Sequence, residues 1–153
     1  MAGNRVFRGA GDHPRVISDR TVTGALLPCT AVSIGASALT QATSASAVRL
    51  ALLMNRDFYG APADAFRSTS PLLTAYTSGE TGLAMVIRPG DEVTWAMAAG
   101  TYTNGQELTV AAGGRLAAAA ATNIVVAHYD GPGATLSAGD LADVCVANFY
   151  TKA

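Results

Sequence analysis

The clearest fold signals of the sequence lie in residues 88–115, which read RPGDEVTWAMAAGTYTNGQELTVAAGGR. Pro89-Gly90 is the central pair of a type II turn, because proline presets φ at the first corner and glycine accepts positive φ at the second. Asn104-Gly105 is favoured where both central residues take positive φ, and Gly113-Gly114 marks a third tight reversal. Three turns so close together exclude long helices and predict an antiparallel meander.

Between these turns the chain has the alternation of half-buried strands. In residues 92–97, Val93, Trp95 and Met97 share one face at period two, while Glu92 and Thr94 lie on the other. We therefore expect Trp95 to be a core residue rather than a binding-site residue. Further strands are predicted at residues 21–27, 30–34, 48–55, 83–88, 107–111, 124–129 and 143–150. The predicted fold class is all-β, a small antiparallel β-sandwich or barrel-like domain with an extended N-terminal arm.

Two stretches lack a clear strand pattern. Residues 36–47 are interrupted by Ser and Thr at almost every second position and are interpreted as irregular chain, with a short helix as the alternative. Residues 55–81 embed Phe58, Tyr59 and Tyr76 among small and polar residues. Their aromatic side chains either pack onto their own domain or anchor a partner.

The chain is predicted to divide into an arm, residues 1–20, and one β-rich domain, residues 21–153. Gly and Pro in the arm argue against a helix, and Arg5, Arg8 and Arg15 alternate there with apolar residues that include Phe7. The arm is either a frayed terminus or a segment that becomes ordered on a partner. In the latter case the guanidinium groups of the arginines and the ring of Phe7 would contact the partner together. If the arm also added a strand to a sheet of the partner, the new backbone hydrogen bonds would offset the conformational entropy that the arm loses on ordering.

Composition excludes several classes of function. Ten basic and eleven acidic residues give a net charge of −1, so we expect no nucleic-acid partner. The sequence has no apolar run long enough for a membrane helix and no signal-peptide pattern, which predicts a soluble protein without a membrane partner. Half of the residues are hydrophobic, but many of these are alanine, which contributes little burial. Such a core predicts a marginal monomer and therefore self-association.

Catalytic and metal-binding patterns are sparse. Cys29 and Cys145 are the only cysteines and lack metal-ligand spacing, so they are interpreted as buried free thiols, with a disulfide as the alternative. A weak cation site could combine His128 and Asp130, but these two ligands have no supporting cluster. No nucleophile motif or phosphate-binding glycine loop occurs, so no enzyme activity, cofactor or metal is expected.

The turn motifs also carry a resemblance to a known family. Arg-Pro-Gly-Asp-Glu at 88–92, Tyr-Thr-Asn-Gly-Gln-Glu-Leu at 102–108, Gly-Gly-Arg-Leu at 113–116 and the closing apolar strand at 144–150 resemble tailed-phage head decoration proteins, also called capsid cement proteins. The resemblance covers about two-fifths of the chain, and its short glycine motifs specify turns better than function.

This resemblance implies a small β-tulip-like protein, often a homotrimer, that binds the outer surface of an icosahedral head and bridges major capsid proteins. Its location would be the virion, with assembly in the host cytoplasm. The candidate capsid-binding residues are Arg5, Phe7, Arg8 and Arg15 in the arm and Phe58 and Tyr59 in the 55–81 stretch.

Two alternatives stay open. A phage fibre or a receptor- or carbohydrate-binding β module would display clustered aromatics with polar partners, for which Phe58, Tyr59 and Tyr76 are the candidates. A small hydrolase would need His128 and Asp130 to converge with groups that are distant in the sequence.

Overall fold

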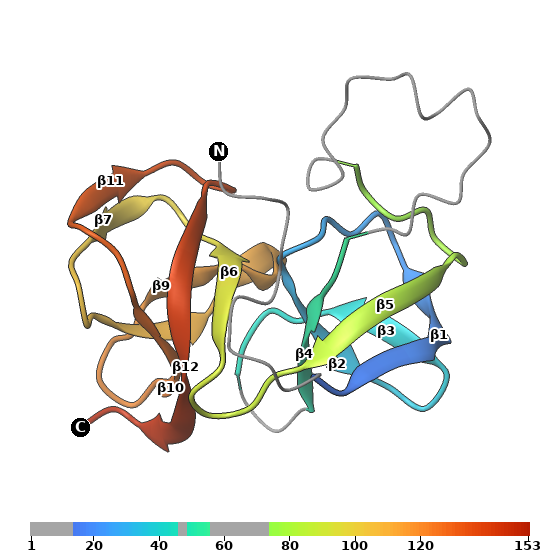
Figure 1. The fold of residues 1–153 in the computed structure, drawn as a ribbon, viewed down its shortest axis with the longest axis horizontal. Helices are drawn as coiled ribbons and strands as arrows, with labels where there is room; N and C mark the ends of the chain where they lie inside the picture. Colours follow the sequence, from blue (N-terminus) through green and yellow to red (C-terminus); the bar gives the residue numbers. More distant parts are fainter. Residues whose placement is uncertain (1–13, 46–48, 56–73) are drawn as a thin grey trace.

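Two β lobes lie side by side along the long axis of the molecule (Figure 1). The structure, a computed structural model, describes residues 14–45, 49–55 and 74–153. Within this part, the one helical element is a short 3-10 turn, η2 (Ala112–Gly114). None of the described helical structure is long and apolar enough to cross a membrane. The predicted all-β class is confirmed.

The N-terminal lobe is a closed five-stranded barrel with the order β1-β3-β2-β4-β5. Its strands are β1 (Val16–Thr23), β2 (Ala31–Ile34), β3 (Ala38–Gln41), β4 (Leu50–Leu53) and β5 (Thr81–Val86). The barrel closes because β1 pairs with both β3 and β5. The β1–β3 pair is parallel, in contrast to the antiparallel pairing predicted, and the other pairs are antiparallel.

Two boundaries of the prediction are corrected in this lobe. β1 begins at Val16, so residues 16–20 belong to the barrel and not to an arm, and residues 1–13 lie outside the described part. β3 lies within the 36–47 stretch that was interpreted as irregular. Its backbone is held by two neighbours, β1 and β2, and this pairing outweighs the weak strand propensity of Ala38-Leu39-Thr40-Gln41.

The C-terminal lobe is a five-stranded sheet with the order β6-β12-β10-β8-β9, beside a two-stranded β7–β11 ribbon. Its strands are β6 (Glu92–Ala96), β7 (Gly100–Tyr102), β8 (Glu107–Val110), β9 (Leu116–Ala118), β10 (Ile124–Tyr129), β11 (Ala134–Leu136) and β12 (Leu141–Thr151). The two edges of the sheet meet at one parallel bridge between Met97 and Leu116. There the Ala98 N–H donates to the Leu116 carbonyl at 2.7 Å.

The predicted meander is wrong, although its turns are present. Gly90 has φ +87°, as the type II turn requires, and Gly113 and Gly114 both have positive φ in the β8–β9 hairpin. Of the Asn104-Gly105 pair, Gly105 alone has positive φ. In the sheet, β12 lies between β6 and β10. Among the described strands of this lobe, β8 and β9 are the only two that follow each other in the sequence and are also hydrogen-bonded to each other.

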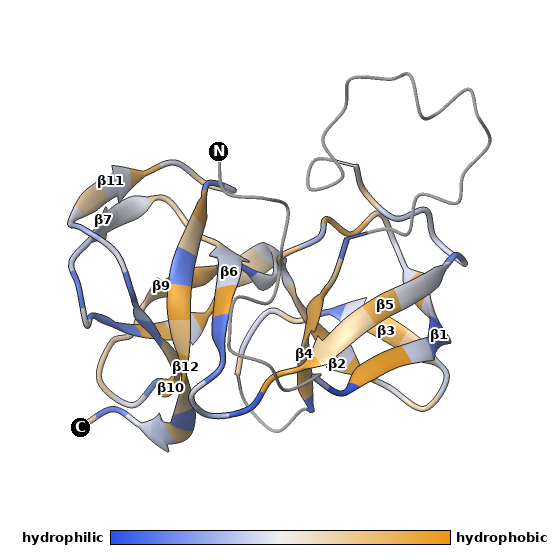
Figure 2. Ribbon diagram, viewed as in Figure 1, coloured by the Kyte–Doolittle hydropathy of each residue, from blue (hydrophilic) through white to orange (hydrophobic). Residues whose placement is uncertain are grey.

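Two hydrophobic clusters meet at β4. Leu50 and Leu52 pack in a cluster with the C-terminal lobe, whereas Ala51 and Leu53 pack inside the barrel. A strand buried on both faces is continuously apolar, as β4 is in Figure 2, whereas β12 shows alternating bands. The barrel cluster consists of Val22, Leu26, Val32, Leu39, Ala51, Leu53, Tyr76 and Ala84.

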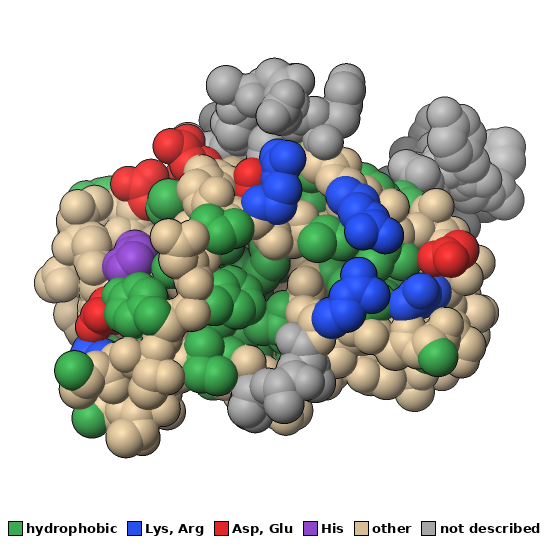
Figure 3. Space-filling model, turned by 90° about the horizontal axis from the view of Figure 1, so that it is seen from below, with side chains coloured by type: hydrophobic (Ala, Val, Ile, Leu, Met, Phe, Trp, Pro, Cys, Tyr) green, Lys and Arg blue, Asp and Glu red, His purple; other side chains and the backbone are tan. Residues whose placement is uncertain are grey.

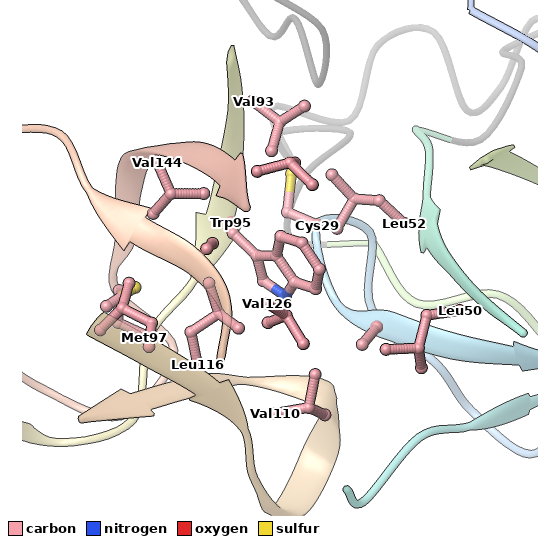
Figure 4. Close-up of a cluster of buried hydrophobic side chains, with 14 of the residues drawn as sticks. Cys29, Leu50, Leu52, Val93, Trp95, Met97, Val110, Leu116, Val126 and Val144 are labelled. Atoms are coloured by element: carbon pink, nitrogen blue, oxygen red, sulfur yellow. The ribbon is translucent and has the colours of Figure 1, made fainter. Parts of the chain in front are cut away.

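Trp95 lies at the centre of the larger cluster, between side chains of both lobes (Figure 4). It is completely buried, as predicted, and its indole Nε1–H donates to the Gly114 carbonyl at 3.0 Å. A Cβ at Gly114 would lie 2.5 Å from the Ala31 carbonyl oxygen, so the β8–β9 turn is packed directly against β2. The C-terminal lobe therefore completes its core with the outer face of the barrel.

Candidate functional site

Arg15 is the one predicted capsid-binding residue that the structure describes. Arg5, Phe7, Arg8, Phe58 and Tyr59 lie outside the described residues. Arg15 is exposed directly before β1, and its backbone carbonyl accepts a hydrogen bond from the Val86 N–H at 2.8 Å. This bond fixes the backbone at the point where the N-terminal stretch joins the barrel.

Three arginines gather at the end of the barrel where β1 and β4 begin and β5 ends. We call Arg15, Val16, Arg49 and Arg88 the arginine end. The pairing of Val16 with Met85 and of Ala51 with Val86 brings the three strand ends together. Arg88 pairs with Asp91 at 3.4 Å, whereas Arg15 and Arg49 have no ion pair among the described residues.

Charge is divided unequally between the two halves of the chain. Residues 1–90 carry eight basic and five acidic residues, whereas residues 91–153 carry two basic and six acidic ones. On the face drawn in Figure 3, basic side chains gather over the barrel half and acidic ones are more frequent over the other half. The near-neutral total therefore hides a basic lobe and an acidic lobe.

A second polar region crosses the outer face of the C-terminal sheet. Glu92, Cys145, His128 and Glu107 occupy paired positions on β6, β12, β10 and β8. Directly opposite side chains on neighbouring strands lie about 5 Å apart at Cβ. The row thus places a thiol, an imidazole and two carboxylates side by side, a juxtaposition that the sequence analysis missed.

Within this region one network joins His128, Tyr150, Glu107 and Lys152. The Tyr150 hydroxyl donates to Glu107 Oε1 at 2.7 Å, and Lys152 Nζ lies 2.9 Å from Glu107 Oε2. His128 Nε2 lies 3.1 Å from the same hydroxyl. Since the hydroxyl has a single proton and gives it to Glu107, His128 is the donor in that contact and carries its proton on Nε2.

The network shifts the acidity of two of its members. Hydrogen bonds from Tyr150 and Lys152 lower the pKa of Glu107 below its usual value. The same bond to Glu107 raises the pKa of Tyr150, because an ionised phenolate could not donate it. Glu107 is therefore held ionised and Tyr150 neutral around neutral pH.

Both thiols of the chain are free, as expected from the sequence. Cys29 is fully buried, and burial raises its pKa to about 12. Cys145 is half-buried rather than buried, and its pKa is raised by burial and by the nearby charges of Glu92, Asp130 and Asp91. The nucleophile in cysteine chemistry is the thiolate, so neither thiol is activated.

The site does not assemble the catalytic pair considered in the sequence analysis. The partner of the His128 ring is the Tyr150 hydroxyl, while the Asp130 N–H binds the Asp143 carbonyl across to β12. Among the described residues, no three His, Cys, Asp or Glu side chains are placed to hold a metal ion. On the outer face of the sheet His128, Tyr150, Glu107 and Lys152 thus bond to one another and do not form a catalytic pair with Asp130.

The aromatic cluster proposed for ligand binding is wrong for Tyr76. This side chain is 2% exposed inside the barrel, where its hydroxyl donates to the Met54 carbonyl at 3.1 Å. In the part of the chain that the structure describes, the exposed aromatic side chains are instead Phe149 and Tyr150, at the end of β12. Sequence reasoning missed them because they extend an alternating strand pattern, and the bulge that changes their orientation has no signal in residues 143–150.

A crevice of about 200 Å³ opens where the two lobes meet. The barrel contributes Ala25, Leu27, Pro28, Thr30 and Gln41, and the C-terminal lobe contributes Ala96, Gly113, Arg115, Gly139 and Leu141.

No protein-family model matches the chain, and a search of curated proteins finds no sequence relative.

Proposed function

We propose that this protein is a non-enzymatic phage head decoration protein that binds the outer surface of the capsid and bridges major capsid proteins. The observation that carries the proposal is the arginine end. It combines Val16, whose side chain is 41% exposed, with two arginines that have no ion pair within residues 14–45, 49–55 and 74–153. An arginine fork pairs bidentately with carboxylates of a partner, and an apolar neighbour excludes water from such contacts.

The position of the arginine end in the chain supports the same function. Residues 1–13, which include Arg5, Phe7 and Arg8, join the barrel beside Arg15. A partner that binds the arginine end would therefore also be within reach of these residues. In this proposal the N-terminal stretch and the arginine end form one basic and apolar capsid-binding region.

Two further observations favour this function over the alternatives. The motifs that resemble decoration proteins form turns, with positive φ at Gly90, Gly105 and Gly113. The exposed Tyr150 hydroxyl is already bonded to Glu107 and His128, which leaves it less able to bind a sugar than a free aromatic platform would be. We propose a homotrimer located on the virion surface, with assembly in the host cytoplasm and no cofactor.

Co-sedimentation with phage heads that lack their own decoration protein tests the proposal. Deleting residues 1–13 leaves β1 intact, whereas deleting 1–17 would remove the buried Ile17 and damage the barrel. We expect the 1–13 deletion and the double variant Arg15→Ala/Arg49→Ala each to weaken binding about tenfold or more.

The matched control is Arg15→Lys/Arg49→Lys, which keeps both charges but loses the bidentate geometry. We expect it to bind with an affinity between that of the parent and the alanine variant. The proposal fails if the parent protein does not sediment with any heads, or if the deletion and the alanine variant both bind like the parent.

A further inference from the structure

Large apolar side chains are exposed at three places in the described part of the chain. They are Val16, Leu27, Leu141, Phe149 and Tyr150, each 38–41% exposed. Val16 belongs to the arginine end. Leu27 and Leu141 both line the crevice between the lobes, and Phe149 and Tyr150 are adjacent at the end of β12, where we call them the aromatic knob.

The crevice is suited to a single apolar side chain. Its volume of about 200 Å³ is below the roughly 300–1,000 Å³ of pockets that hold drug-sized ligands. Leu27, Pro28 and Leu141 supply apolar walls from both lobes. Arg115 adds a guanidinium that has no ion pair among the described residues.

The aromatic knob is held in place by its backbone and by hydrogen bonds. Phe149 has φ +49°, a left-handed conformation that is rare for a bulky residue. It lies in a bulge where the register slips, because Val125 pairs with Tyr150 but Ala127 pairs with Val146. Tyr150 is fixed by Glu107 and His128. A bulge changes the direction in which the side chains of its strand point, and here Phe149 and Tyr150 are both exposed beside it.

The knob cannot fill the crevice of its own chain. Leu141 and Phe149 are eight residues apart on the single strand β12, which runs the length of the lobe in Figure 1. At about 3.3 Å per residue they are separated by about 26 Å. We propose that the aromatic knob of one copy docks in the lobe crevice of a second copy of this chain.

Charge complementarity supports a second copy as the occupant. Among the residues that line the crevice Arg115 is the charged one, and a guanidinium is attracted to the faces of aromatic rings such as those of Phe149 and Tyr150. The contact is head-to-tail, so it uses different surfaces on the two copies and closes into a ring when the rotation between copies permits. This contact does not require capsid binding.

Cross-linking between two variants tests the contact directly. In a Cys145→Ser background, one sample carries Leu141→Cys and the other Phe149→Cys, while Cys29 stays buried and protonated. A disulfide requires Cα atoms within about 7 Å, so a bond between these positions can form only between copies. We expect the mixture to give a covalent dimer on a non-reducing gel, with much less in either sample alone.

Native mass measurement gives an independent readout. Phe149→Gly removes the ring at a backbone conformation that glycine adopts without strain, so the fold is retained. We expect self-association to weaken about tenfold or more, and Thr23→Ala, at an exposed barrel residue outside the arginine end and the crevice, to serve as a control that associates like the parent. Melting curves of both variants establish that they are folded.

Three results overturn this inference: a monomeric parent at micromolar concentration, an unchanged mass for Phe149→Gly, or no mixed disulfide. A monomeric parent whose Phe149→Gly variant loses head binding assigns the knob to the capsid instead. Head binding by a parent that stays monomeric would leave capsid binding standing while contradicting the homotrimer, so capsid binding and the contact between copies can fail separately.

Discussion

The barrel and the C-terminal sheet both curve around apolar side chains, but they close in different ways. The five barrel strands are paired continuously, and the cluster inside them belongs to this lobe alone. The C-terminal sheet meets itself at one bridge, between Met97 and Leu116, and shares its core with Leu50 and Leu52 of β4. The barrel therefore acts as a template on which the second lobe is completed.

The largest effect is expected at Trp95, where the two lobes share their core. Trp95→Ala would leave a cavity between the lobes and remove the bond to the Gly114 carbonyl. We expect a loss of about 3–5 kcal/mol in the free energy of unfolding, measured by denaturant titration. Trp95→Phe, which keeps most of the burial, should lose less. A Trp95→Ala variant that unfolds like the parent would contradict the shared core.

Neighbouring leucines on β4 test the template relationship. Leu52 faces the C-terminal lobe and Leu53 faces the barrel interior, and both are fully buried. Each change to alanine should cost about 2–5 kcal/mol. Hydrogen exchange should show that Leu52→Ala selectively loosens β6, β10 and β12, whereas Leu53→Ala loosens both lobes. Equal exchange patterns in the two variants would contradict the template role of the barrel.

A glycine pair at the junction isolates the close contact between the lobes. Gly113 and Gly114 both have positive φ, so alanine is strained at either position. At Gly114 the added Cβ would also meet Ala31 backbone atoms at 2.5 and 2.7 Å, whereas at Gly113 the nearest atom is the end of Arg115 at 3.7 Å. We expect Gly114→Ala to melt at a lower temperature than Gly113→Ala, by an extra cost of about 1–3 kcal/mol.

The smallest effect is expected at the outer face of the C-terminal sheet. Because the pKa of Glu107 is lowered in the folded state, its ionised form stabilises the fold above the usual carboxyl pKa. That contribution is lost as the pH falls through the lowered value. Glu107→Gln should therefore melt slightly below the parent at neutral pH and equal it in acid. A constant difference at every pH would contradict the assignment.

Part of this architecture could be predicted from the sequence. Residues 92–97 and 124–129 have a period-two pattern or an apolar run between turn residues, and these signals predicted β6 and β10. β3, β7, β9 and β11 have only three or four residues and are rich in Ala, Gly and Thr, so their pairing depends on distant partners. The prediction of the strand order was wrong for the same reason, since the local turns carry no information that β12 pairs with β6.

The candidate site was less predictable than the fold. The basic and apolar pattern before β1 singles out Arg15 in the sequence, and its role in capsid binding stays a prediction. The Glu92-Cys145-His128-Glu107 row depends on the register of four strands, and the crevice depends on how the lobes pack. Neither has a local pattern that sequence reasoning could detect.

The insertion of β12 between β6 and β10 also matters while the chain is being made. The residues of β12 that pair with β6 are synthesised about fifty residues after it, since Leu141 pairs with Ala96 and Cys145 with Glu92. At about 5–20 residues per second, β6 waits roughly 2–10 seconds on the ribosome for this neighbour. During that interval Val93 and Trp95 lie on an unpaired edge, which is the kind of surface that chaperones bind and that aggregates. The emergence of β12 from the ribosome exit tunnel therefore sets the earliest moment at which the second lobe is protected.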